Sequence, residues 1–135
     1  MGVPERLLSR VLWACDSTRW PDRAAFDAAV RQYHLDIVKS DERWTPDAVA
    51  VRAPVVRVGF MCWTDDDQQI EPVLTLKADD GQAFTNLELL HKVCDGIAAY
   101  LVEHKCALYD HHFFEGLGLH QGAGEPPLYH VWFGS

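Results

Sequence analysis

The segment from Thr85 to Leu101 constrains the fold most, because it predicts a long amphipathic helix between two regions of β-type sequence. The spacing Thr85-x-x-Glu88 allows both side chains to bond free backbone amides at the start of a helix. Apolar residues then recur on one face over about five turns, namely Leu87, Leu90, Val93, Cys94, Ile97 and Leu101. A helix with one apolar face must pack that face against another element, so we expect it to cover a sheet.

Sequence typical of strands flanks this helix on both sides. The segments PVVRVGFMCW (residues 54–63) and IEPVLTLKA (residues 70–78) are rich in β-branched and aromatic residues, and we expect them to pair as antiparallel strands. Pro72 has no amide hydrogen, so the second of these strands should lie at an edge or begin after the proline. Two more strands are expected from HHFFEGLGLH and PLYHVWF, which flank the glycine-containing segment QGAGEP.

Helical spacing in the N-terminal region predicts two more helices. The apolar residues of segment 3–14 are Leu7, Leu8, Val11 and Leu12, which favour a helix. A second helix is expected from about Trp20-Pro21 to His34. Residues 35–53 remain ambiguous between a short helical turn and a strand over AVAVR.

The order of these segments predicts an α+β fold in one domain spanning residues 1–135. In this fold, N-terminal helices are followed by ββαββ, and one antiparallel sheet is packed on one face by helices. A chain of this length can bury about two-thirds of the surface that its unfolded form exposes, so it needs no disulfide or metal to fold.

The negative charge of the chain is concentrated in its second half. Residues 1–60 contain nine Lys or Arg and eight Asp or Glu, whereas residues 61–135 contain three and twelve, and the chain carries −8 overall. Such a surface repels phosphate backbones and attracts basic proteins, so we expect a basic protein partner and no direct nucleic-acid binding. Alternatively, the acidity only keeps the protein soluble.

Membrane and redox signals are absent from the sequence. No apolar run approaches the roughly 20 residues needed to span a bilayer, and the N-terminus has no signal-peptide pattern, so we expect a cytoplasmic protein that does not contact membranes. The four cysteines form no C-x-x-C pair and are expected to be buried free thiols: Cys15, Cys62, Cys94 and Cys106. No cofactor is expected.

Histidines in the last third of the chain give the strongest catalytic hint. His91 with Asp95, and His111 with Glu115, have the residue types and spacing of metal ligands. The adjacent His111 and His112 would point to opposite faces of a strand, so one site could not use both. No phosphate loop, nucleophile elbow or H-E-x-x-H helix accompanies them. We expect no metal site and no enzyme, and a small metal-dependent hydrolase using these histidines is the alternative.

Aromatic and acidic residues are the best candidates for a partner-binding surface. Trp63 ends a predicted strand immediately before TDDDQQ, and an aromatic anchor with an acidic rim is typical of binding hot spots. A second patch is predicted around Asp110, His111 and Glu115. The predicted partner-binding residues are Trp63, Asp65, Asp66, Asp67, Glu71, Asp110, His111 and Glu115. The alternative is that Trp63 is an ordinary strand-end residue beside a solvated turn.

The end of the chain resembles the C-terminal hairpin of small bacterial immunity proteins, which inhibit cognate toxins. The resemblance covers residues 109–135 and rests on DHHFFEGLGL, a turn containing glycine and proline, and PLYHVWFGS. It implies a small cytoplasmic binder without catalytic residues, and it assigns no role to any single residue. We therefore expect a non-enzymatic inhibitor of a cognate toxin or other basic protein. A homodimer formed through PLYHVWF remains an open alternative.

Overall fold

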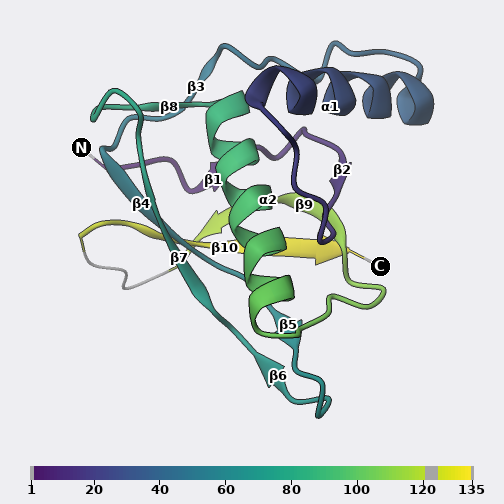
Figure 1. Ribbon diagram of the computed structural model, residues 1–135. Coiled ribbons are helices and arrows are strands. Elements are labelled where there is room, and N and C mark those ends of the chain that lie inside the picture. The colour runs from purple at the N-terminus through teal and green to yellow at the C-terminus, as the bar shows by residue number, and fades with distance from the viewer. Residues whose placement is uncertain (1, 121–124, 135) are drawn as a thin grey trace.

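A mixed β-sheet crossed by one long helix forms the centre of the structure (Figure 1). The computed structural model of the protein describes residues 2–120 and 125–134. The strands of the main sheet are β1 (Arg6–Leu7), β2 (Trp13–Ala14), β4 (Val55–Gly59), β7 (Val73–Lys77), β9 (Phe113–Leu119) and β10 (Leu128–Gly134). Their order is β1-β9-β10-β4-β7, and β2 also pairs with β9. Two small ribbons pair β3 (Val49–Val51) with β8 (Phe84–Thr85), and β5 (Cys62–Trp63) with β6 (Gln69–Ile70).

The predicted long helix is present as α2 (Asn86–Glu103), which lies across one face of the sheet (Figure 1). Thr85 caps it, because its hydroxyl accepts a hydrogen bond from the amide of Glu88 at 3.1 Å. The Glu88 carboxylate was predicted to accept a hydrogen bond from a free amide at the start of the helix, and it does not. It accepts instead from the amide of Asp79 at 2.8 Å and lies 2.9 Å from Lys92 Nζ. The start of α2 is thereby tied to the loop that follows β7.

The second predicted helix is present as α1 (Arg23–Val38), slightly displaced toward the C-terminus. The carboxylate of Asp22 caps it by accepting from the amide of Ala25 at 2.8 Å. Phe26 of α1 packs on the ring of His91 in α2, with ring centroids 5.0 Å apart. Phe26 is completely buried, so this contact joins the two helices within the core.

The prediction of a helix over residues 3–14 is wrong. The segment forms β1 and β2, both of which pair with β9, and Leu8 has a φ of +57°, which a right-handed helix does not contain. Its backbone makes hydrogen bonds to residues distant in the sequence instead, since the Leu12 amide donates to His34 Nε2 at 3.0 Å. Leu7, Leu8 and Val11 are nevertheless buried. The apolar spacing therefore indicated burial correctly but not the backbone conformation.

The predicted antiparallel sheet and the order of helices before strands are also wrong. β10 runs parallel to β4, from the pair Leu128↔Arg57 to the pair His130↔Gly59. The described residues form two helices and ten strands, and two strands precede α1. The predicted antiparallel pairs β4–β7 and β9–β10 are present, and β7 begins after Pro72 at the edge of the sheet. Part of the predicted turn between β9 and β10, residues 121–124, lies outside the described residues.

The segment PLYHVWF, predicted as a possible dimer surface, is mostly β10 in the middle of the sheet. Tyr129 and Val131 are buried within the chain, whereas Trp132 is 42% exposed and its ring lies 4.8 Å below the Arg6 guanidinium. Dimerisation through this strand stays a prediction. Within residues 2–120 and 125–134, neither helix combines the length and apolar character that crossing a membrane requires.

Candidate partner-binding surface

The three adjacent aspartates occupy the turn of the β5–β6 ribbon, which projects beyond the C-terminal end of α2 (Figure 1). The turn bonds its own backbone: the amide of Thr64 donates to Gln68 O and the amide of Asp67 donates to Thr64 O, both at 2.9 Å. Asp67 has a φ of +62°, a conformation that aspartate tolerates better than most residues. Asp65, Asp66 and Asp67 are all exposed, so their carboxylates are free to meet a partner.

The chain that follows α2 lies beside this ribbon and carries the second predicted patch. The amide of Trp63 donates to Ala107 O at 2.9 Å, and the amide of Ala107 donates to Trp63 O at 2.8 Å. This bridge places two rings against the indole of Trp63, that of Tyr109 at 5.7 Å and that of His111 at 5.3 Å between centroids. The His111 ring is stacked, with 28° between the planes. The structure thus brings the Trp63 patch and the Asp110–His111 patch together.

A hydrogen bond fixes the aromatic group to the acidic turn. The Tyr109 hydroxyl donates to Asp67 Oδ1 at 2.8 Å, and this bond to a carboxylate raises the pKa of the Tyr109 phenol. Tyr109 is 55% exposed and was not among the predicted residues. Its only sequence signal was its position directly before Asp110. We define the acidic tip as Trp63, Asp65, Asp66, Asp67, Tyr109, Asp110 and His111.

Two predicted partner-binding residues lie outside this surface. Glu115 is on β9, where its carboxylate lies against Gly134 of β10. Glu71 is exposed in the link between β6 and β7. The prediction that His111 and His112 occupy two faces of one strand is wrong, because β9 begins only at Phe113. They still face different surroundings: His111 stacks on Trp63, and His112 Nδ1 donates to Tyr109 O at 2.9 Å.

The carboxylates of the acidic tip lie close together in the structure, and no lysine or arginine neutralises them among the described residues. Within the described part of the chain, no ion pair with Lys or Arg involves Asp65, Asp66, Asp67 or Asp110, and the His111 ring is the basic group nearest Asp110, at 3.5 Å. Four aspartates elsewhere do have cationic partners: Asp27 and Asp41 pair with Arg31, Asp79 with Arg23 and Lys92, and Asp95 with Arg19. The tip therefore presents uncompensated negative charge.

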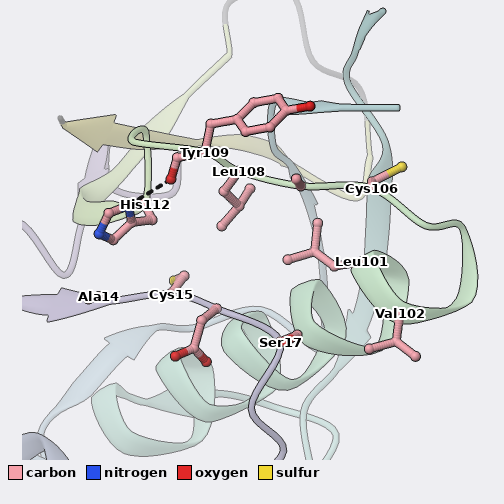
Figure 2. Close-up of a pocket in the computed structure, with 11 residues that line it drawn as sticks. Ala14, Cys15, Ser17, Leu101, Val102, Cys106, Leu108, Tyr109 and His112 are labelled. Carbon is pink, nitrogen blue, oxygen red and sulfur yellow. Dashed lines mark hydrogen bonds between the residues drawn. The ribbon is translucent and has the colours of Figure 1, made fainter. Parts of the chain in front are cut away.

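A pocket of about 570 Å³ adjoins the acidic tip and shares Tyr109 with it. Its lining comes from the connector after β2, the end of α2 and the segment before β9: Ala14, Cys15, Asp16, Ser17, Leu101, Val102, Cys106, Ala107, Leu108, Tyr109 and His112. Figure 2 shows Leu101 and Leu108 pointing toward each other, while the ring of Tyr109 extends away from them.

Two polar side chains of this pocket are bonded to backbone groups. Asp16 Oδ1 accepts from the Thr18 amide at 2.8 Å, and the Nδ1 atom of His112 is bonded to a backbone carbonyl. Among the described residues, no hydrogen bond joins Asp16, Ser17 and His112. A nucleophile, a base and an orienting group joined by hydrogen bonds are typical of a covalent mechanism, and we assign no such roles to these three residues.

The residue pairs with metal-ligand spacing do not converge. His91 packs on Phe26, and Asp95 accepts from Arg19 Nη2 at 3.0 Å, so neither faces the His111 region. The described residues contain no group of three or more His, Cys, Asp or Glu side chains that could hold a metal ion. We therefore assign no metal ligands.

Comparison with known proteins returned no match among family models, curated proteins or solved structures. The functional interpretation therefore depends on the geometry of the acidic tip and on the resemblance of the C-terminal segment to immunity proteins.

Proposed function

We propose that this protein is a non-enzymatic inhibitor of the immunity-protein type, which acts in the cytoplasm and binds a basic toxin or other basic protein through the acidic tip. The observation that carries the proposal is the aromatic group of the exposed Tyr109 with the half-buried Trp63 and His111, held against uncompensated carboxylates. The resemblance of residues 109–135 to immunity proteins supports the inhibitory role.

The geometry of the tip suits protein recognition for two reasons. Aromatic rings that are already packed and hydrogen-bonded lose little conformational freedom on binding, which reduces the entropic cost of association. Uncompensated carboxylates attract a basic surface and increase the rate of encounter. A toxin that acts on nucleic acid needs a basic cleft, and the aspartates would occupy the positions that phosphates take in that cleft.

The test begins with chemical cross-linking in the source cells, followed by mass spectrometry to identify the partner and the cross-linked residues. Association of the purified pair is then measured at several salt concentrations with the variant Asp65→Asn/Asp66→Asn/Asp67→Asn. At low salt we expect its association rate constant to fall about tenfold or more, with a weaker salt dependence.

The matched control is Asp36→Asn/Glu42→Gln/Asp47→Asn, which removes the same number of charges from exposed positions in the other half of the chain. This variant should associate nearly as fast as the unaltered protein. Equal rate constants for both triple variants would exclude the acidic tip as the docking surface.

Inhibition requires a readout separate from binding. The activity of the identified partner, or growth of cells that produce it, is measured with and without saturating amounts of this protein. We expect the partner's activity to be lost, and Trp63→Ala to weaken complex formation by about 30-fold, as for a central aromatic hot spot. Full activity of the saturated partner would refute the inhibitory role while leaving binding intact.

A further inference from the structure

Two of the four free cysteines are in direct contact in the core. The Sγ atoms of Cys15 and Cys94 lie 3.6 Å apart, although the residues are 79 positions apart in the sequence. Cys15 is 2% exposed and Cys94 is 7% exposed. A disulfide has a sulfur–sulfur distance of about 2.05 Å, so the sulfurs need to approach by roughly 1.5 Å. Side-chain rotation with a small backbone shift can supply such a movement.

The surroundings of the two residues indicate which one a reagent can reach. Cys94 lies in the middle of α2, where the helix fixes its backbone. Cys15 follows β2 and begins a connector without helix or strand that ends at Asp22, before α1. Cys15 also lines the 570 Å³ pocket (Figure 2). The pocket gives a small reagent a route toward Cys15 that Cys94, on the buried face of the helix, lacks.

We propose that Cys15 and Cys94 form an intramolecular disulfide when the protein reacts with a low-molecular-weight disulfide such as oxidised glutathione. Cys15 loses its thiol proton to water, and its thiolate attacks one glutathione sulfur. The glutathione disulfide bond breaks, a mixed disulfide forms on Cys15, and the released thiolate takes up a proton. Cys94 then loses its proton and attacks the Cys15 sulfur, which expels the second glutathione. Two protein thiols are oxidised, and one glutathione disulfide is reduced to two thiols.

The second step limits the rate. Burial raises the pKa of the Cys94 thiol well above its ordinary value, and the neighbouring Cys15 sulfur raises it further. Only a small fraction of Cys94 is therefore thiolate, and disulfide formation should accelerate as the pH rises. Once formed, the bond fixes the connector that carries Asp16 and Ser17 to α2. One wall of the pocket beside the acidic tip is then held in place covalently.

The experiment uses the folded full-length chain with oxidised glutathione at mildly alkaline pH. The reaction is stopped with acid, remaining thiols are alkylated, and the protein is digested with trypsin. The four cysteines fall in four different tryptic peptides, residues 11–19, 58–77, 93–105 and 106–135, so each possible bond has its own mass. We expect a linked pair of 11–19 with 93–105, and a decrease in free thiols from four to two.

Variants distinguish the proposed Cys15–Cys94 bond from a bond that involves Cys62 or Cys106. Cys62→Ser/Cys106→Ser retains the proposed pair and should form the same link at a similar rate. Cys94→Ser should stop at a stable glutathione adduct on Cys15. Three results in the unaltered folded protein would overturn the proposal: unreacted Cys15, a persistent glutathione adduct on Cys15, or a link that joins other peptides. A 15–94 link that appears only in denaturant would overturn it as well.

Discussion

Acidification should destabilise this protein at an unusually high pH because two histidines are held neutral by the fold. His34 is completely buried, and its Nε2 accepts a hydrogen bond from the Leu12 amide at 3.0 Å. The ring proton is therefore on Nδ1, which has no hydrogen-bond partner among the described residues. Protonation of Nε2 would break the bond to Leu12. Burial lowers the pKa of His34, and the nearby charge of Arg43 lowers it further.

His91 adds a second group of the same kind. Neither of its ring nitrogens has a hydrogen-bond partner within the described part of the chain, and the ring packs on Phe26. Burial is the main cause that lowers the pKa of His91, followed by the charge of Arg23. The second proton that a charged His91 ring carries would have no acceptor among residues 2–120 and 125–134.

The size of the effect follows from proton linkage. Below the unfolded-state pKa of about 6.5, the unfolded chain binds a proton at each of these histidines that the folded chain does not bind. Unfolding then takes up protons, so the free energy of unfolding rises with pH. The stability is fully present above about pH 6.5 and is lost as the pH falls from there toward the lowered folded-state pKa. Each histidine contributes at most about 1.4 kcal/mol per pH unit to this slope, and the two together contribute at most about 2.8 kcal/mol per pH unit.

Carboxylates act in a separate pH range. Hydrogen bonds from Lys92 and Arg23 lower the pKa of Asp79 from 3.8 to about 2. Because a lowered carboxyl pKa contributes stability only above the unfolded-state value, this contribution is lost between about pH 4 and pH 2. The histidine effect is therefore measurable alone between about pH 5 and pH 7.

The assay is urea unfolding at a series of pH values in that range, with the variant His34→Gln. Glutamine can place an amide oxygen near the position of Nε2, so it can accept from Leu12 without titrating. In His34→Gln we expect the slope of unfolding free energy against pH to fall to about half of its value in the unaltered protein. The same substitution at an exposed histidine, His104→Gln, serves as the control for the exchange of histidine for glutamine itself. Equal slopes for the unaltered protein and His34→Gln would refute the reasoning, as would stability that rises toward pH 5.

Two other changes test the core. Tyr129→Phe removes the hydroxyl that donates to Pro4 O at 2.6 Å, so urea unfolding should show a loss of about 1–3 kcal/mol at neutral pH. Burial raises the pKa of Tyr129 to about 12, so the unaltered protein should lose stability as the pH rises from about 10, and the variant should lack this loss. Ile97→Ala opens a cavity beneath α2 at a completely buried position and should cost about 2–5 kcal/mol in the same assay, whereas a loss under 1 kcal/mol would contradict the packing.

Local signals predicted the elements whose structure is decided locally. The cap at Thr85 and the apolar stripe after it were sufficient for α2, and Pro72 was sufficient for the edge position of β7. Residues 3–14 are different, because their conformation depends on pairing with β9, which lies about a hundred positions later in the chain. The parallel pairing of β4 with β10 depends on long-range contacts as well, and no pattern within either strand encodes it.

The acidic tip was predictable in its parts but not in its assembly. Trp63 and the three aspartates were singled out because they adjoin in the sequence, and Asp110 and His111 because they adjoin elsewhere. These two groups lie together in the structure because of the β-bridge between Trp63 and Ala107, which are 44 positions apart in the sequence. Tyr109 joins the tip only through this bridge, and its position directly before Asp110 was too weak a signal to single it out.

The charge arrangement of the tip adds little to the stability of the fold. Adjacent like charges repel one another in the folded state, and exposed aspartates gain little stability unless a cation lies near. Elsewhere this chain supplies such cations, as Arg31 does for Asp27 and Asp41. At the tip, an exposed tyrosine donates to Asp67 instead, and a stacked histidine is the basic group nearest Asp110. The hydrogen bond from Tyr109 holds Asp67 in place without cancelling its charge, as we expect of a surface that binds a cationic partner.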